Sequence, residues 1–317
     1  MGSIEQAPVA SQALPVAVDK HDVYPFISID GNLKDAAKGK SVLVTGAGTG
    51  IGKAIALAFA RAQADILILT SRRQSVLDAV KKEIEGTAST TKVLVIPADI
   101  TDEKTVETLF SKIKAEGVTV NVLVNNAAGH YNRASIIGSS VEDWWKGWEV
   151  LLKGPFAMTS YFLRHLEQAN SMSNNVLINV SSLAAILPVP GQSDYNVAKL
   201  ALNRLTEWTA LEGRRFGLRA ISYHPGGIDG TEMVQKIPEW MKSFMTETAE
   251  LAAHVAVYLQ TSRAAYLNGR FLDGRMDLEQ LEKYQDKIVK ENLLTFGLLG
   301  YDPIPMPDML LAMFDER

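Results

Sequence analysis

The sequence predicts a doubly wound α/β fold, in which helices cover both faces of a parallel sheet. Short β-branched and leucine-rich runs alternate with longer segments whose apolar residues recur with helical spacing. Such alternation is typical of parallel strands joined by crossover helices. It continues without a break over about 230 residues, which favours one large domain over two small ones.

Seven runs are predicted to be the strands of this sheet. They are residues 41–45, 66–70, 93–97, 120–125, 176–181 and 218–223, with a weaker run at 267–272. Helical spacing marks the segments between them, such as 52–62, 73–85 and 104–115. This domain is expected to span residues 40–275.

The two ends of the chain fall outside the alternation. Residues 1–39 lack clean periodicity and are predicted to be a surface arm that docks through residues 24–27. Residues 276–317 are predicted to be a helical extension, with an amphipathic helix over 276–294 whose inner face carries Leu278, Leu281, Tyr284 and Ile288. Two roles for this helix stay open: packing on its own domain, or covering a substrate pocket or a partner subunit.

Composition excludes several kinds of chemistry. The chain has 317 residues, 47% of them hydrophobic, with a formal net charge of −4, five histidines and no cysteine. The charge argues against nucleic acid or an anionic membrane as a partner. The absence of cysteine excludes disulfides and thiolate chemistry, and no metal site is expected. Because neither a secretory signal nor an apolar run of about 18 residues is present, we expect a cytoplasmic protein.

A glycine-rich turn follows the first predicted strand and opens a helix. Glycines permit a tight turn and let backbone N–H groups approach a pyrophosphate at the positive end of the helix dipole. The alternative is a plain strand-to-helix connection, but the position between a strand and a helix favours a dinucleotide site. The residues concerned are Gly46, Gly48, Thr49, Gly50, Ile51 and Gly52.

The residues after the second strand indicate which dinucleotide binds. An acidic residue there would accept hydrogen bonds from a ribose 2′-hydroxyl, but the chain has Ser71, Arg72 and Arg73. A hydroxyl beside guanidinium groups suits a 2′-phosphate, so NADP(H) is favoured over NAD(H). The alternative is that both arginines are solvated residues at a helix start.

Asp99 and Ile100 follow the third predicted strand. They are candidates for contact with the edge of an adenine ring. The alternative for Asp99 is that its side chain caps a helix beginning near Thr101.

A tyrosine and a lysine are spaced for acid–base chemistry. Tyr195 and Lys199 are four residues apart, so they lie on one face of a helix. A tyrosine has a pKa of about 10 and is a poor base at neutral pH. A neighbouring cation favours the phenolate and moves the pKa of the phenol towards a useful value.

With the glycine turn, the Asn-Asn-Ala-Ala-Gly run at 125–129 and the Ser-Ser pair at 181–182, this spacing resembles the short-chain dehydrogenase/reductase family over about residues 40–274. The resemblance implies a Rossmann-type sheet of about seven parallel strands that binds NAD(P). It implies that Tyr195 is the general acid/base, that Lys199 holds the nicotinamide ribose, and that Ser182 orients the substrate oxygen. It also implies that the segment from His224 to Ile228 contacts the nicotinamide through its backbone. The residues that it implies for cofactor contact are Tyr195, Lys199, Asn126, Ala127, Ala128, Pro225, Gly226, Ile228 and Thr231.

Three features depart from the family pattern. Leu151 stands where the family usually has an asparagine that anchors a water next to the lysine, which puts the usual proton relay in doubt. The segment from Gly226 to Thr231 is one residue longer than usual, which bears on whether Thr231 reaches the phosphates. Most members also stop shortly after the position of Gly274, whereas this chain continues.

The substrate pocket is expected between residues 129–137, 183–194 and 230–247. Its apolar candidates suit a bulky, weakly polar carbonyl compound or alcohol, and little fixed positive charge argues against a phosphorylated or coenzyme A substrate. The alternative is that half of them pack the lid helix. They are Tyr131, Ile186, Leu187, Pro188, Met233, Ile237, Trp240, Met241, Phe244 and Met245.

Three tryptophans, Trp144, Trp145 and Trp148, crowd one predicted helix. Packing in the core or between subunits is favoured over stacking on a ligand. A homodimer or homotetramer is therefore expected.

The predicted function is an NADP(H)-dependent ketoreductase or alcohol dehydrogenase that acts on a hydrophobic small molecule, in specialised metabolism. One alternative is enoyl or dienoyl reduction, because the run at 125–131 and Leu151 resemble 2,4-dienoyl-CoA reductases. The other is a non-redox NADP-binding scaffold or cyclase. The complete set of Ser182, Tyr195 and Lys199 argues against the scaffold.

Overall fold

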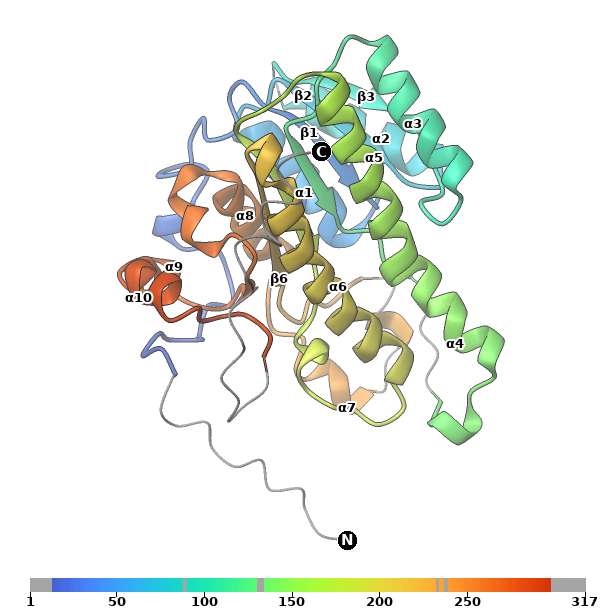
Figure 1. Cartoon of the computed structure of the whole chain (residues 1–317), viewed down its shortest axis with the longest axis vertical. Helices are drawn as coiled ribbons and strands as arrows, with labels where there is room; N and C mark the ends of the chain where they lie inside the picture. The colour runs from blue at the N-terminus through green and yellow to red at the C-terminus, as the bar shows by residue number, and fades with distance from the viewer. Residues whose placement is uncertain (1–12, 88–89, 130–133, 232–233, 237–238, 298–317) are drawn as a thin grey trace, which may run out of the picture.

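A parallel sheet of seven strands lies at the centre of the computed structural model, which describes residues 13–87, 90–129, 134–231, 234–236 and 239–297 (Figure 1). The strand order β3-β2-β1-β4-β5-β6-β7 reverses between β1 and β4, which confirms the predicted doubly wound sheet. The strands are β1 (Ser41–Thr45), β2 (Ile66–Thr70), β3 (Lys92–Val95), β4 (Val122–Asn125), β5 (Asn175–Val180), β6 (Leu218–His224) and β7 (Phe271–Asp273).

Helices cover both faces of the sheet (Figure 1). Because successive side chains point to opposite faces of a strand, Val42 and Val44 of β1 join one core while Leu43 joins the other. The first core lies under α1 (Gly50–Arg61), α2 (Gln74–Gly86) and α8 (Ala249–Gln260). The second lies under α3 (Glu103–Ala115), α5 (Gly154–Gln168) and α6 (Ser193–Glu212). Within the described residues, every helix is too short or too polar to span a bilayer.

Shorter helices complete the described fold. They are α4 (Val141–Trp148), α7 (Glu239–Lys242), α9 (Leu278–Glu282) and α10 (Gln285–Lys290). A π-helical segment, Glu149–Lys153, joins α4 to α5 in one continuous rod. Such segments arise where a helix accommodates one extra residue, and they are frequent near functional sites.

Two predicted elements differ from the structure by more than two residues in their extent. The last strand begins at Phe271 and not at residue 267, because Ser262–Leu267 forms a 3-10 helix and Gly269 has a φ of +71° that breaks extended backbone. The helix predicted over 276–294 is divided into α9 and α10. Its predicted inner residues Leu278, Leu281 and Ile288 are nevertheless fully buried, so the described part of the extension, up to residue 297, packs on its own domain.

The described part of the N-terminal arm lies beside the start of the C-terminal extension. Val18 and Met276 form an antiparallel bridge, and the Leu278 N–H donates to the Tyr24 hydroxyl at 2.8 Å. Ile27 is fully buried in the core under α8. The arm and the start of the C-terminal extension, more than 200 residues apart in sequence, are therefore in direct contact.

Candidate active site

A cavity of about 1090 Å³ opens at the carboxyl ends of β1, β4 and β5. The glycine turn between β1 and α1 lines one end, and the side chains of Ser182, Tyr195 and Lys199 line the other. All of the other residues predicted to contact a cofactor also line this cavity. They are Gly46, Gly48, Thr49, Gly50, Ile51, Gly52, Ser71, Arg72, Arg73, Asp99, Ile100, Asn126, Ala127, Ala128, Pro225, Gly226, Ile228 and Thr231.

The glycine turn has the geometry that a bound pyrophosphate needs. Gly46 has a φ of +66°, and a Cβ on Gly52 would lie 2.2 Å from the Gly46 carbonyl oxygen. Thr49 precedes α1 in extended conformation and its side chain makes no capping hydrogen bond. The first N–H groups of α1 have no acceptor within the helix, so they can receive phosphate oxygens. These residues fit a dinucleotide.

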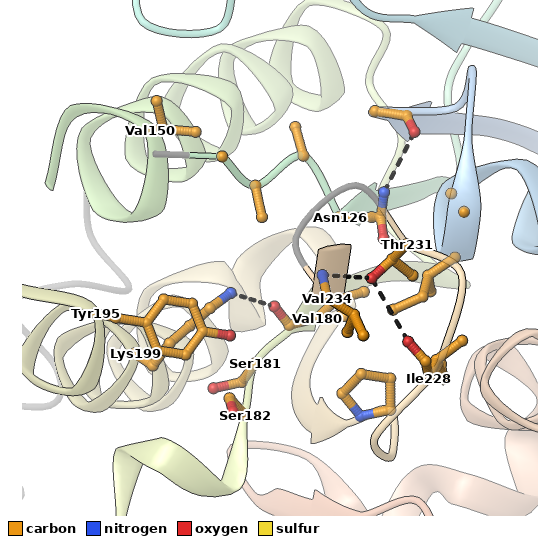
Figure 2. Close-up of a pocket in the computed structure, with 18 of the residues that line it drawn as sticks. Asn126, Val150, Val180, Ser181, Ser182, Tyr195, Lys199, Ile228, Thr231 and Val234 are labelled. Atoms are coloured by element: carbon orange, nitrogen blue, oxygen red, sulfur yellow. Dashed lines mark hydrogen bonds between the residues drawn. The ribbon is translucent and has the colours of Figure 1, made fainter. Parts of the chain in front are cut away.

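Thr231 lies at this turn despite the longer segment before it. Its Cγ2 is 3.4 Å from the position that a Cβ on Gly50 would take. Its hydroxyl receives the Val234 N–H at 3.3 Å and lies 3.5 Å from the Ile228 carbonyl oxygen (Figure 2). The extra residue therefore does not carry Thr231 away from the glycines.

Hydrogen bonds fix the ends of β1 and β4 to each other. Thr45 Oγ1 accepts the Asn126 N–H and the Ala127 N–H, each at 3.0 Å, and the Asn126 side chain donates to the Thr45 carbonyl at 2.9 Å. These bonds hold the floor of the cavity at the position where the strand order reverses. Crevices at such positions are the usual ligand sites of doubly wound sheets.

Lys199 and Tyr195 project from the first two turns of α6 beside Ser182 (Figure 2). Lys199 is 4% exposed, and its Nζ donates to the Val180 carbonyl at 2.8 Å. The same Nζ lies 5.7 Å from the centre of the Tyr195 ring. Burial disfavours the ammonium and lowers the pKa of Lys199 to about 8.

Ser182 follows β5 and caps a short 3-10 turn. Its Oγ accepts the Ala184 N–H at 3.1 Å, which leaves the hydrogen of the hydroxyl available to a ligand in the cavity. The hydroxyl can therefore donate to a substrate oxygen while the backbone bond fixes its position.

A buried amide chain beneath the site was missed by the sequence reasoning. The Asn125 side chain donates to Asn179 Oδ1 at 2.9 Å, and the Asn179 side chain donates to Thr206 Oγ1 at 2.8 Å. It ties β4 and β5 to α6, the helix that carries Tyr195. Asparagines inside two buried strand runs are the sequence signal that could have found it.

Leu151 lies in the π-helical segment and is 1% exposed. Its neighbours Glu149 and Val150 line the cavity, whereas Leu151 faces the protein interior. An apolar side chain therefore stands where the family's asparagine was expected.

The predicted pocket wall is partly correct. Leu187, Phe244 and Met245 line the cavity, but Ile186 and Pro188 do not, and Ile186 is exposed. The wall also includes Leu183, Val189 and Val234. Five further candidates lie outside the described side chains: Tyr131, Met233, Ile237, Trp240 and Met241.

Two cations that were not among the predicted wall residues line the cavity, each paired with carboxylates. Arg275 and Lys146 both line the cavity, in addition to Lys199. Arg275 pairs with Asp273 at 2.8 Å, and Lys146 pairs with acidic neighbours on α4. Neither residue lies in the segments predicted to form the wall, 129–137, 183–194 and 230–247.

Asp99 does not cap α3. The cap is Asp102, which accepts the Lys104 N–H at 3.0 Å, and α3 begins at Glu103. Asp99 instead accepts the Thr101 N–H at 2.9 Å in the preceding turn, and it lines the cavity beside Ile100.

The predicted tryptophan cluster exists on α4. The ring centres of Trp144 and Trp148 are 5.0 Å apart, and Trp144 Nε1 donates to Ser193 Oγ at 3.1 Å. No tryptophan of this cluster lines the cavity.

Comparison with known proteins agrees with this geometry. A sequence profile described as short chain dehydrogenase matches residues 40–242. The short chain dehydrogenase mpl6 of Monascus purpureus is 32% identical over 88% of this chain and 94% of its own length. The short chain dehydrogenase andI of Emericella variicolor is 33% identical over 81% of this chain and 88% of its own length.

Solved structures show the same fold. A 7α-hydroxysteroid dehydrogenase complexed with NADH and 7-oxo-glycochenodeoxycholic acid matches with a TM-score of 0.69 at 24% identity, over 76% of this chain and 94% of that protein. The 3-oxoacyl-[acyl-carrier protein] reductase of Brucella melitensis matches with a TM-score of 0.67 at 23% identity, over 76% and 91%. From its profile match, its relatives and its sheet, the chain belongs to the short-chain dehydrogenase family of oxidoreductases.

Proposed function

We propose that this protein is an NADP(H)-dependent ketoreductase that interconverts a ketone and a secondary alcohol on a bulky hydrophobic small molecule. The observation that carries the proposal is the single cavity that joins the glycine turn and Arg72 to Ser182, Tyr195 and Lys199. A nicotinamide bound there supplies a hydride in reduction and accepts one in oxidation.

The side chains of this site can handle the accompanying proton. In reduction, the Tyr195 phenol donates its proton to the substrate oxygen, and the hydroxyl of Ser182 donates a hydrogen bond to the same atom. The buried ammonium of Lys199, fixed by the Val180 carbonyl, favours the phenolate that remains. In oxidation the same groups act in reverse, with the phenolate as base.

Residues at the far end of the cavity support NADP(H). Ser71, Arg72 and Arg73 line the cavity next to the glycine turn, and the side chains of both arginines are exposed. Guanidinium groups bind a 2′-phosphate through charge-assisted hydrogen bonds. The Arg72→Ala, Arg73→Ala double variant should raise the KM for NADPH about tenfold or more and leave the KM for NADH almost unchanged. Equal changes for both cofactors would contradict this preference.

The substrate class follows from the wall near Tyr195. Leu183, Leu187, Val189, Phe244 and Met245 line the same cavity as Tyr195, which suits an apolar ring system or chain. The relatives in Monascus and Emericella support a role in fungal specialised metabolism.

A Tyr195→Phe variant tests the chemistry. It should lower kcat for the reduction of every active ketone by about 100-fold or more, while the Kd for NADPH changes far less. Tyr161→Phe is the matched control, because that hydroxyl contacts Glu103 and does not line the cavity. If Tyr195→Phe reduces ketones at the wild-type rate, the proposed mechanism is wrong.

The alternatives predict other outcomes in the same assay. An enoyl reductase would consume NADPH with conjugated enoyl thioesters and not with ketones. A scaffold or cyclase would bind NADPH and consume none. Leu151 favours the scaffold because it places an apolar side chain at the usual relay position.

We also propose a homodimer or homotetramer. Large apolar side chains are exposed on α4, α5 and α6, where a second copy can cover them. They are Val141, Trp145, Phe156, Val197, Leu200 and Trp208. A monomer in light scattering at micromolar concentration would contradict this assembly.

A further inference from the structure

The arm, the lengthened segment after β6 and the start of the C-terminal extension meet at one place. Glu247, two residues before α8, lies between them, and its side chain is 1% exposed. The Gly226–Gly227 turn on its other side lines the cavity. The arm and the lengthened segment after β6 are therefore in contact through one carboxylate.

Glu247 links the arm directly to the turn. Its Oε2 accepts the Gly227 N–H at 2.6 Å, and its Oε1 lies 2.7 Å from His21 Nδ1. A carboxylate only accepts hydrogen bonds, so Nδ1 of His21 carries the hydrogen. The Thr246 hydroxyl also donates to Oε1, at 2.7 Å.

The Gly226–Gly227 turn is in direct contact with Glu247. Gly226 has a φ of +101°, and a Cβ there would lie 2.7 Å from the Cβ of Glu247. The backbone of Glu247 also donates to the Gly227 carbonyl at 3.0 Å. Because the two segments are in direct contact, a rotated Glu247 side chain would remove the acceptor of the Gly227 N–H and move the turn.

Backbone bonds hold His21 at this position. The Thr248 N–H donates to the His21 carbonyl at 2.9 Å, and the Lys20 N–H donates to the Arg275 carbonyl at 3.0 Å. The Thr248 hydroxyl donates to Asp22 at 2.8 Å. The backbone of the arm is thus fixed on both sides of His21, which places its imidazole, 58% exposed, against the buried carboxylate of Glu247.

We propose that His21 is a positioning residue for the nicotinamide half of the cofactor, which it holds through Glu247 and the Gly226–Gly227 turn. The inference rests on the proposed cofactor site. The adenosine half, expected at Ser71–Arg73 and Asp99–Ile100 beyond the glycine turn, does not depend on this contact. Loss of the imidazole would leave a buried carboxylate with one charge-assisted partner fewer, so the carboxylate would reorient and release the turn.

Titrations with a whole and a truncated ligand test the inference. The wild type is first titrated with NADPH and with NADH to find which dinucleotide binds more tightly. That dinucleotide is then compared with a ligand that lacks the nicotinamide. This ligand is ADP-ribose if NADH binds more tightly, and ADP-ribose with a 2′-phosphate if NADPH does. His21→Ala should weaken the dinucleotide about tenfold, within the range of one hydrogen bond to a charged group, and leave the truncated ligand unchanged. His21→Asn places an amide N–H where Nδ1 lies and should restore binding to within about twofold.

Asp30→Asn is the matched control in the same arm. Asp30 pairs with Arg61 at the end of α1, far from the turn, so both ligands should bind as they do to the wild type. Equal weakening of both ligands by His21→Ala, or no weakening of either, would overturn the inference while leaving the proposed function intact. A wild type that binds neither dinucleotide would contradict the proposed function, and the inference with it.

Discussion

Replacing Lys199 by Met should make the stability of the protein respond differently to pH. Burial lowers the pKa of Lys199 from 10.5 to about 8. At 1.36 kcal/mol per pH unit, this corresponds to a cost of about 3 kcal/mol for burying the ammonium at low pH. The hydrogen bond from Nζ to the Val180 carbonyl offsets part of this cost.

The direction in which the free energy of unfolding changes with pH follows from proton binding by the folded and unfolded chains. Below pH 8 the folded and unfolded chains both hold the proton, so this lysine does not make the free energy of unfolding depend on pH. Between about 8 and 10.5 the unfolded chain alone holds it, so the free energy of unfolding of the wild type rises with pH. Above 10.5 neither state holds it. The wild type should therefore gain about 3 kcal/mol relative to Lys199→Met across this interval.

Urea denaturation of both proteins without cofactor, from below pH 8 to above 10.5, measures the difference. Comparison at each pH cancels the titration of groups that the two proteins share. Lys112→Met, at an exposed lysine of α3, is the matched control for the loss of one ammonium group. A constant difference for Lys199→Met would refute the desolvated ammonium and the role assigned to it beside Tyr195.

Two further variants test other parts of the site. Gly52→Ala would place a Cβ 2.2 Å from the Gly46 carbonyl, so it should lower the free energy of unfolding by about 1–3 kcal/mol and weaken dinucleotide binding in titrations; unchanged values would contradict the close approach. Burial lowers the pKa of His224 from 6.5 to about 4, so the unfolded chain alone takes up a proton between these values. The wild type should lose up to about 3 kcal/mol relative to His224→Gln as pH falls through this range, and parallel urea midpoints would argue against a buried neutral imidazole.

Much of the fold could be predicted because the pattern is local. The first two strands agree with their predicted bounds, since buried parallel strands are continuous apolar runs. The last strand was placed too early because the apolar residues of a 3-10 helix precede it. The C-terminal helix was drawn too long, because spacing alone does not show that the chain turns at Tyr284.

The candidate site was predictable where motifs encode geometry. The turn after β1 and the spacing of Tyr195 and Lys199 fix short-range structure, and all of these residues line one cavity. The contact between His21 and Glu247 joins residues 226 positions apart, and no local pattern predicts it. The same applies to Arg275, which reaches the cavity only because β7 lies beside β6.

Isotope transfer tests the central claim most directly. The wild type is incubated with a hydrophobic ketone and NADPH deuterated at the transferable position of the nicotinamide, and the product is examined by mass spectrometry and NMR. An oxidoreductase of the proposed kind yields an alcohol with deuterium on the carbinol carbon, and Tyr195→Phe yields almost none. A product that forms without deuterium, while NADPH is not consumed, would contradict the account and show a non-redox reaction on the same fold.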